Sequence, residues 1–263
     1  MMLAQLPFFT LASLLVAFFV VRTALVQGLQ HALDRHPFFK KRRIFHAQPA
    51  PGQMRRELIA NGFVVVTEGL FWAVALHFGL AGKDGGNIIA SFVVCLVWWD
   101  ISFYISHRAL HTKLLFPLHR QYHRARINTA FSGASFSIAE ALFLMTAGWG
   151  PLLALSHWWG MSYLGVFAFH EFFSVLRTTG HFNSEFYPQF WVRSKWFNWM
   201  QTTTFHALHH SRSRGHFGLF TVIPDRLMNT AFADYEDVHD RAFNGDTSAS
   251  ELASAPVTVK AAA

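Results

Sequence analysis

Long apolar segments constrain the fold of this chain more than any other feature of its sequence. A membrane-spanning helix needs about 20 mostly apolar residues, and five stretches approach or exceed that length. They cover residues 6–27, 58–81 and 88–106 and, with less definite ends, 134–149 and 152–176. Gly150 and Pro151 separate the last two stretches, and this pair predicts a turn between two helices of a hairpin. Because lipid offers no partners to an open backbone, we expect an all-α integral membrane bundle of four or five transmembrane helices.

The composition agrees with a membrane protein and excludes several other classes. Only 14% of the residues are charged and 52% are hydrophobic, whereas a soluble domain carries about 25% charged residues. The net charge of +7 is not accompanied by a nucleic-acid-binding motif, so we expect no nucleic-acid partner. Cys95 is the single cysteine, which rules out a disulfide within the chain and a cysteine-based zinc site.

The basic residues predict the orientation of the bundle. They concentrate in three segments, 35–56, 108–126 and 177–214, whereas the connection 82–87 carries only Lys83 and Asp84 as charged residues. Counting the turns of the chain places all three basic segments on one side of the membrane. The positive-inside rule identifies that side as the cytoplasm, so the sequence predicts a cytosolic, histidine-rich helical cap there.

Histidines recur at helical spacing in this predicted cap. One pair is His107 and His111, a second is His119 and His123, and a third motif contains His206, His209 and His210. Residues three or four positions apart share one face of a helix, and neutral imidazole is the commonest protein ligand of transition metals. Pro117 is expected to break the helix between the two pairs, so that the second folds back toward the first.

The number of imidazoles predicts two metal ions rather than one. With His181, which follows Gly180 at the exit of the hairpin, eight histidines are candidate ligands, and a tetrahedral ion takes four. His170 is a ninth candidate, as a ligand or as a partner of a ligand, because ionisable groups within membrane spans tend to be functional. His216 is considered as a partner of a ligand.

These motifs carry a family resemblance over roughly residues 90–232. The stretch from Asp100 to His111 looks like the first histidine box of the fatty acid hydroxylase/sterol desaturase superfamily, and His206–His210 with the following segment to Asp225-Arg-Leu-Met-Asn-Thr looks like its last box. The resemblance implies a non-haem diiron oxygenase with two iron ions, which uses O2 to hydroxylate or desaturate a lipid such as a fatty acyl chain or a sterol.

One position departs from the family pattern. The middle box usually reads H-x-x-H-H, but here Tyr122 precedes His123 at an expected ligand position. Three explanations stay open at this point. Tyr122 binds one iron through its phenolate, or His170 or His216 replaces the missing imidazole, or the protein is a degenerate metal-binding member of the family. An active enzyme is the favoured hypothesis because the other two boxes are intact.

Other residues are candidates for supporting roles. Asp100, directly before the first box, is expected to hydrogen-bond a ligand imidazole, with an interfacial charge as the alternative, and Glu140 and Glu171 are considered for the same role. The sequence has no cytochrome b5 haem motif and no cysteine cluster. We therefore expect a separate electron donor, a ferredoxin or a cytochrome b5, to dock on the basic face.

The domain organisation follows from these elements. We expect one membrane-embedded catalytic domain over 1–243, followed by a disordered tail over 244–263. Within the domain, 1–57 form an anchor helix and basic loop, 58–106 two spans, 107–128 the first two boxes, 130–176 the hairpin, and 177–243 the third box and cap. The rival functions are a transporter or sensor, which would hold its ligands near the middle of the bilayer, and a zinc hydrolase, which needs fewer histidines.

Overall fold

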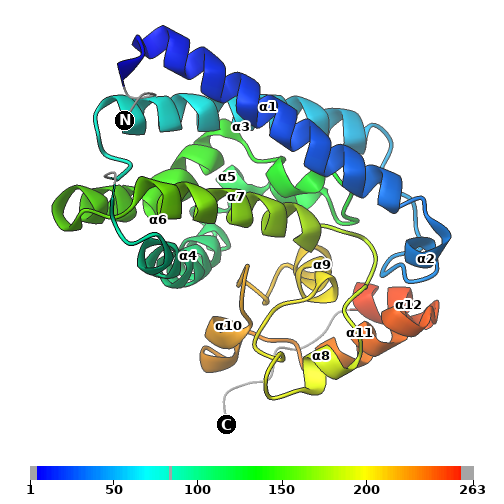
Figure 1. Ribbon diagram of the computed structural model, residues 1–263. Helices are drawn as coiled ribbons and strands as arrows, with labels where there is room; N and C mark the ends of the chain where they lie inside the picture. The colour runs from blue at the N-terminus through cyan, green and yellow to red at the C-terminus, as the bar shows by residue number, and fades with distance from the viewer. Residues whose placement is uncertain (1–4, 83–84, 256–263) are drawn as a thin grey trace.

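The computed structural model describes residues 5–82 and 85–255, and within these ranges the chain forms helices without any named strand. Five long helices make the upper part of the molecule in Figure 1. They are α1 (Phe8–Leu33), α3 (Gln53–His77), α4 (Ile88–Leu110), α6 (Ile138–Trp159) and α7 (Tyr163–Gly180). All but α7 are long and apolar enough to cross a membrane, which confirms the predicted class of fold.

The predicted turn at Gly150 and Pro151 is wrong. The α6 helix continues through Pro151 to Trp159, and the chain reverses at Gly160, whose φ of 72° is the left-handed conformation that glycine adopts easily. A proline inside a helix leaves the carbonyl four residues earlier without its usual N–H donor. Here the hydroxyl of Ser102 on α4 donates to that carbonyl, of Ala147, at 3.0 Å. A neighbouring helix therefore compensates for the proline.

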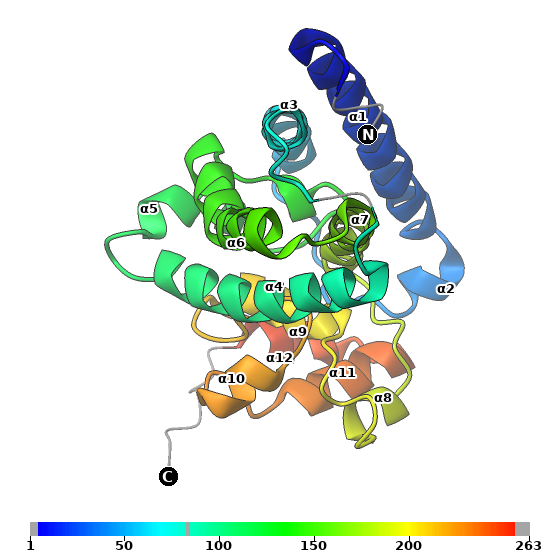
Figure 2. The same ribbon diagram turned by 60° about the vertical axis from the view of Figure 1, so that its left-hand side comes forward.

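The α4 helix lies between the other long helices and the C-terminal third of the chain. It is seen end on in Figure 1 and lengthwise in Figure 2, where α6 and α7 are seen nearly end on. Gly148 allows this close crossing, because a Cβ atom at that position would lie 2.3 Å from the Trp99 ring. The C-terminal end of α4 thus reaches the boundary between the bundle and the segments below it.

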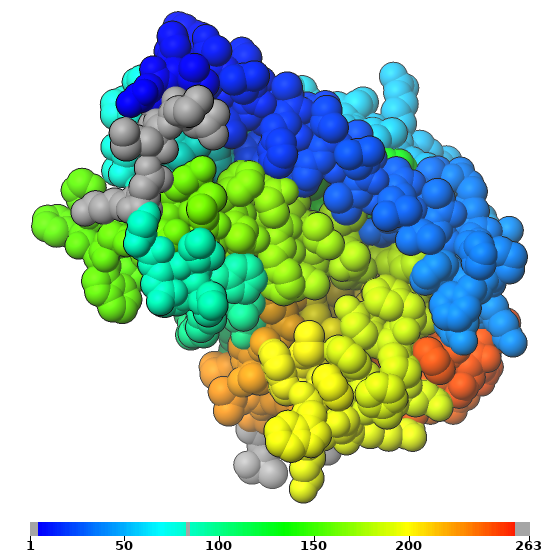
Figure 3. Space-filling model, in the orientation of Figure 1, coloured from blue at the N-terminus to red at the C-terminus, as the bar shows by residue number. Residues whose placement is uncertain are grey.

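Short helices form the cap beneath α4. They are α8 (Phe190–Arg193), α9 (Thr203–Arg212), α10 (Ile223–Leu227), α11 (Tyr235–Asn244) and α12 (Ser248–Ser254). At the centre lies α9, which is buried along Thr203–His210 and packs through Phe205 and Leu208 against Val238. Figure 3 shows these yellow-to-red segments as a lobe on the side of the molecule opposite α1. The smaller elements are α2 (Pro37–Lys40), α5 (Phe116–His119) and the 3-10 turns η2 (Tyr122–Arg124) and η3 (Ser132–Ala134).

Part of the predicted disordered tail is ordered. Residues Ser248–Ser254 form α12, with Ala249 and Ala253 fully buried in the core of the cap. Small side chains of low hydrophobicity carry little periodic signal, and the helix is stabilised by packing on α9 and α11 instead. The remainder of that predicted tail, 256–263, lies outside the described residues.

Large apolar side chains are exposed on the outer faces of the long helices. Phe9 and Leu25 on α1 and Ile89 on α4 are 83%, 68% and 77% exposed, and similar side chains line α3. Such a surface is too apolar for water but suits the acyl chains of a bilayer. The molecule therefore presents a lipid-compatible exterior above the cap.

Candidate metal centre

All eight histidines of the predicted set converge in two adjacent groups. The five-histidine group contains His107, His111, His119, His123 and His209, and the three-histidine group contains His181, His206 and His210. Within each group, the candidate ligand nitrogens lie within 4.8 Å of one another. The groups are neighbours, since the rings of His123 and His210 are 5.1 Å apart.

The first two pairs meet because the chain reverses after α4. His107 lies in the last turn of α4, which ends at Leu110, and His111 caps it. Pro117 is not the residue that ends this helix. It lies in the first turn of α5, where its missing N–H removes no helical hydrogen bond. His119 closes α5 and His123 follows on η2, so the second pair folds back against the first, as predicted.

The α9 helix contributes one ligand candidate to the five-histidine group and two to the other. His206 and His210 are one turn apart and face the three-histidine group, and His209 faces the five-histidine group. The buried carboxylate of Glu185 accepts a hydrogen bond from Thr204 N at 2.9 Å in the first turn. This contact stabilises the start of a helix that lacks a side-chain cap of its own.

Backbone carbonyls fix the orientation of three imidazoles. The Nδ1–H groups of His107 and His209 donate to Phe217 O and Gly215 O, each at 2.8 Å, and that of His181 donates to Arg177 O at 2.6 Å. A neutral imidazole with its proton on Nδ1 has a bare lone pair on Nε2. These lone pairs therefore point into the two groups.

A carboxylate orients a fourth imidazole. Glu140, on α6, lies with its Oε1 atom 2.5 Å from His119 Nδ1, and both side chains are fully buried. A carboxylate that accepts the outer proton of a histidine holds the ring and raises its basicity toward a metal. Glu140 thus fills the supporting position for which the sequence made it one of three candidates.

The donor set fits metal ions. The Nε2 atoms of His107 and His119 face each other at 3.1 Å, and the Nε2 atoms of His123 lie at 3.1 Å from those of both His111 and His209. Several of these nitrogens bring lone pairs together without a proton between them, which is repulsive unless a cation shares them. Buried, neutral, convergent imidazoles are the ligands that iron, zinc and copper accept.

Tyr122 directs its phenol oxygen into the three-histidine group. The oxygen lies 2.5 Å from His181 Nε2 and 3.0 Å from His206 Nε2. The ring is buried and stacks on Phe136 at a centroid distance of 4.9 Å. Of the three explanations for the departure from H-x-x-H-H, this geometry favours the phenol as the replacement donor.

His170 and His216 lie apart from both groups. His170 makes contacts with Glu68 at 2.7 Å and with Glu171 at 3.0 Å, inside the bundle. His216 stacks on Phe205 at 3.6 Å and donates to the carbonyl of Phe205. The structure therefore does not bring His170 to the candidate metal centre, and neither histidine is in a position to replace the missing imidazole.

Asp100 does not contact an imidazole, contrary to the expectation from its position before the first box. Its two oxygens accept from the backbone N and the hydroxyl of Thr221, at 3.0 and 2.6 Å. Nor is it an exposed interfacial charge. It fastens α4 to the segment 215–221, whose carbonyls orient His107 and His209.

The sequence analysis did not identify a second aspartate, Asp225, which binds the same segment 215–221 as Asp100 does. Asp225, fully buried on α10, accepts from the backbone of Phe217 and Gly218 at 2.9 and 2.7 Å and from the Thr230 hydroxyl at 2.6 Å. Its place in the segment Asp225-Arg-Leu-Met-Asn-Thr, which carries part of the family resemblance, is the signal that could have identified it. Ser213 was missed as well, and it contacts His123 Nδ1 at 3.1 Å.

Burial keeps the histidines of the cap neutral. It lowers the pKa of His111 to about 4 and that of His181 to about 3, and it lowers the pKa values of His206, His209 and His210 as well. Since metals bind neutral imidazole, these histidines are in the ligand state at neutral pH. Burial also raises the pKa of Tyr122, so the phenol keeps its proton in the absence of a cation.

Two hollows lie close to the centre. One is a narrow cavity of about 40 Å³ between α3, α4, α6 and α7. Its wall includes Phe103, whose ring lies 5.0 Å from that of His107, and Phe136, which stacks on Tyr122. The cavity therefore reaches the side of both histidine groups that faces the membrane helices.

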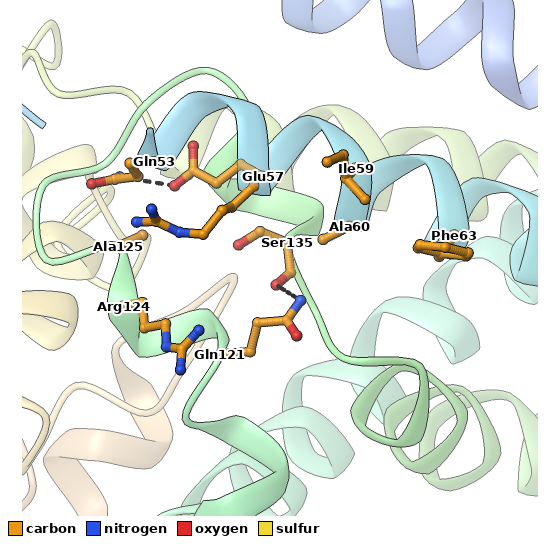
Figure 4. A pocket seen from close by; sticks show the side chains of 10 residues that line it. Gln53, Glu57, Ile59, Ala60, Phe63, Gln121, Arg124, Ala125 and Ser135 are labelled. Carbon is orange, nitrogen blue, oxygen red and sulfur yellow. Dashed lines mark hydrogen bonds between the residues drawn. The ribbon is translucent and has the colours of Figure 1, made fainter. Parts of the chain in front are cut away.

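The other hollow lies between the start of α3 and the segment 121–135 that follows His119. It has a volume of about 270 Å³, and Figure 4 shows Gln53 and Glu57 on α3 opposite Gln121 and Arg124. Its buried carboxylate, Glu57, already accepts from Gln53, Thr129 and Ser132. None of the eight histidines lines this pocket, so it is not part of the metal centre.

Comparison with known proteins identifies a family and several relatives of this chain. A family model for fatty acid hydroxylase matches residues 92–230, which run from α4 to the cap. Very-long-chain aldehyde decarbonylase GL1-5 of Oryza sativa subsp. indica is 23% identical over 229 residues, which are 84% of this chain and 36% of that protein. GL1-1 of the same subspecies is 27% identical over 215 residues, 78% of this chain and 34% of that protein. The chain thus spans about a third of the length of these relatives. No solved structure matches it.

Proposed function

The chain belongs to the fatty acid hydroxylase family, and on that premise we propose that it is a membrane-bound, O2-dependent oxidoreductase that acts on a lipid. Two iron ions are its proposed cofactors. The observation that carries the proposal is the convergence of eight histidines and Tyr122 in two adjacent groups beneath a set of apolar helices.

The proposed ligands divide between the two ions. His107, His111, His119, His123 and His209 would hold one iron, and His181, His206 and His210 with the Tyr122 phenol would hold the other. Iron in such a set supplies the reduction of O2 to an oxidant strong enough for an unactivated C–H bond.

The surrounding residues prepare this chemistry. The carbonyls of Phe217, Gly215 and Arg177 keep three imidazoles in the tautomer that presents Nε2, and Glu140 holds the proton at Nδ1 of His119. The aromatic rings of Phe103 and Phe136 lie against His107 and Tyr122 and would help to keep water away from the site. A preorganised, dry site is what the reaction requires of the protein.

Two substrate classes are consistent with the family and the relatives. Hydroxylation or desaturation of a fatty acyl chain or sterol is the activity that the family resemblance implies. The names of the relatives favour a long-chain aldehyde instead. In both cases the substrate would be a long apolar molecule that reaches the site from the bilayer.

We also propose that electrons come from a separate ferredoxin or cytochrome b5. Five exposed basic residues surround the first two boxes: Arg108, Lys113, Arg120, Arg124 and Arg126. His111 is the half-buried member of the five-histidine group, so we expect the donor to approach the centre at this residue. Turnover in membranes is expected to depend on an added acidic donor and to fall with rising salt. Salt-independent turnover would contradict docking by charge.

The basic residues also support a cytoplasmic location for the histidine groups. A cysteine introduced at Lys113, in an otherwise cysteine-free Cys95→Ser background, tests this orientation. In sealed spheroplasts, a membrane-impermeant thiol reagent is expected to label it only after the membrane is opened. Labelling of intact spheroplasts would reverse the orientation.

Metal content and lipid profiling test the function. Purified protein is expected to contain about two iron ions per chain, and cells that express it are expected to accumulate a lipid product that the His209→Ala variant does not make. His157→Ala removes an exposed histidine at the far end of α6 and is the matched control. A product that gains one oxygen identifies a hydroxylase, one that loses two hydrogens a desaturase, and a chain shortened by one carbon an aldehyde-processing enzyme.

Two rival functions have distinct outcomes in the same experiment. A metal-binding protein without catalysis would retain iron but show no histidine-dependent lipid change and no O2 consumption on reduction. A transporter would hold its ligands near the middle of the bilayer. The two histidine groups lie at the end of α4 and in the cap instead, which supports an enzyme.

A further inference from the structure

The narrow cavity beside the metal centre contains one charged side chain that has no ion-pair partner in the described ranges 5–82 and 85–255. Three of its lining residues are ionisable: Glu68, His170 and Arg177. Glu68 uses one oxygen for His170 and the other for Arg22, and the second nitrogen of His170 contacts Glu171. Among the residues that the structure describes, Arg177 forms no ion pair, because Arg22 takes the contacts with both Glu68 and Glu171.

Arg177 is held in place but left unsatisfied. The residue is 8% exposed, and its Nε atom has no hydrogen-bond partner among the residues whose structure is described. Its guanidinium lies over the rings of Phe136 and Phe173, at 5.9 and 5.5 Å from their centroids, and both rings line the cavity. A buried guanidinium with unused donors is costly unless an acceptor binds it.

The same residue is tied to the metal centre through its backbone. Its carbonyl accepts the Nδ1 proton of His181 at 2.6 Å, and Phe136, on which its side chain lies, stacks on Tyr122. A group bound by the guanidinium would therefore sit directly beside the three-histidine group.

We propose that Arg177 binds the oxygen-bearing end of a single-chain lipid substrate and so places the head of that chain, rather than its middle, at the metal centre. This inference rests on the proposed function and narrows its substrate class. A carboxylate and an aldehyde share the relevant chemistry, an oxygen that accepts from a planar guanidinium. Arg177 is a positioning residue in this proposal.

The size of the cavity agrees with a head group. Its volume is about 40 Å³, and a water-sized group needs roughly 10–15 Å³ of such volume, so about three heavy atoms fit. A carboxylate or aldehyde end matches this space, and a sterol ring system exceeds it. The remaining wall, which includes Leu144, Met145 and Trp149, is apolar, and the alkyl chain would lie along it.

Direct binding tests this proposal independently of catalysis. The iron-loaded full chain in detergent is titrated with palmitate, palmitaldehyde and hexadecane, which share a chain but differ at its end. Wild type is expected to bind the first two at least about tenfold more tightly than the alkane, as charge-assisted hydrogen bonds imply. Palmitate and palmitaldehyde together test whether an oxygen that accepts from the guanidinium is recognised. The one that binds more tightly identifies the natural end group. Equal affinity for all three probes, or binding of none, would overturn the proposal.

Three variants separate recognition from structure. Arg177→Gln is expected to remove the preference for an oxygen-bearing end, and Arg177→Lys to restore part of it. Arg43→Gln removes a partly buried guanidinium that pairs with Asp34 and does not line the cavity, and it is expected to keep the preference. An equal loss in the Arg43→Gln and Arg177→Gln variants would show a merely structural role. If Arg177→Gln does not fold, the comparison of the three probes on wild type and Arg177→Lys decides.

Analysis of the reaction product is a second test of the proposal. If the proposed oxidation occurs, the change should lie at the head-end carbons of the chain. A change in the middle of the chain would contradict head-first binding, even with the oxygen chemistry intact. Absence of any oxidation would count against the proposed function and leave the binding result for Arg177 standing.

Discussion

The phenol oxygen of Tyr122 lies 2.5 Å from Nε2 of His181, although 59 residues separate the two in the chain. Tyr122 interrupts the middle histidine motif in the sequence, but in the folded chain its oxygen lies among the histidines of the three-histidine group. The two candidate metal positions differ in consequence, with imidazoles alone on one side and imidazoles with a phenol on the other.

Replacement of the phenol tests this asymmetry. Tyr122→Phe keeps the ring stacked on Phe136 and removes only the oxygen, so iron is expected to fall from about two ions per chain toward about one. Tyr122→His restores the usual motif and is expected to retain both. Metal analysis of the purified proteins measures the change. Two firmly bound ions in the Phe variant would show that the oxygen is not a ligand.

The carboxylate behind His119 is expected to tune metal affinity. Glu140→Gln keeps the size of the side chain but replaces the negative charge that His119 Nδ1 contacts at 2.5 Å. Loss of such a partner lowers metal affinity by roughly 10- to 100-fold, measurable by competition with a chelator. Glu236→Gln, at an exposed position on α11, is the control and should change nothing. Equal metal affinities of the two variants would show that Glu140 does not support metal binding by His119.

Asp225 is expected to matter for both stability and metal binding. Asp225→Asn places an amide where two backbone N–H groups and a hydroxyl donate, so at least one buried donor loses its acceptor at a cost of about 1–3 kcal/mol. The segment 215–221 should loosen and with it the carbonyl that orients His107. A lower unfolding temperature with weaker iron binding is the expected pair of results, and an unchanged unfolding temperature would argue against this role.

The crossing of α4 over α6 depends on the absence of a side chain at one position. Gly148→Ala would bring a Cβ atom to 2.3 Å from the Trp99 ring, whereas Gly150→Ala, half a turn further along α6, has no atom closer than 3.9 Å. Overpacking of this kind typically costs about 1–3 kcal/mol. We expect a lower unfolding temperature for the first variant and an equal or higher one for the second. Similar behaviour of the two would mean that the helices are further apart.

The metal-free protein should be acid-sensitive. Burial lowers the pKa of His181 and of His216 to about 3, against 6.5 for a free imidazole. Between these values the unfolded chain binds protons that the folded chain excludes, so stability is fully present above about pH 6.5 and falls as the pH drops toward 3. Denaturant titrations of the metal-free protein at a series of pH values measure this slope. A flat profile below pH 6 would contradict neutral burial.

Local signals in the sequence were sufficient to predict which histidines are candidate ligands, but not how these histidines divide between the two groups. Spacings of three and four predicted that His206, His209 and His210 share a helix, and α9 confirms it. Nothing in that spacing indicates that His209 joins the histidines of α4 and α5 while its neighbours join His181. The partition depends on how α9 is rotated against α4, which is decided by packing in the cap.

Other errors have the same origin. Pro151 predicted a turn, but Ser102 on α4 satisfies the carbonyl that the proline leaves free. His170 was a ligand candidate because it is ionisable within a span, but Glu68, from a helix about 100 residues earlier in the chain, engages it instead. In both positions a partner that is distant in sequence changes the meaning of a local pattern.

The sequence by itself determined that this protein is a helical membrane bundle with histidine sets able to hold metal, because apolar length and helical spacing are properties of contiguous residues. Only the tertiary structure decided which imidazoles meet, that Tyr122 joins three of them, and that Arg177, beside them, forms no ion pair with any residue in the described part of the chain. Those relationships arise where separate helices pack together, and the distances between side chains there depend on the whole fold.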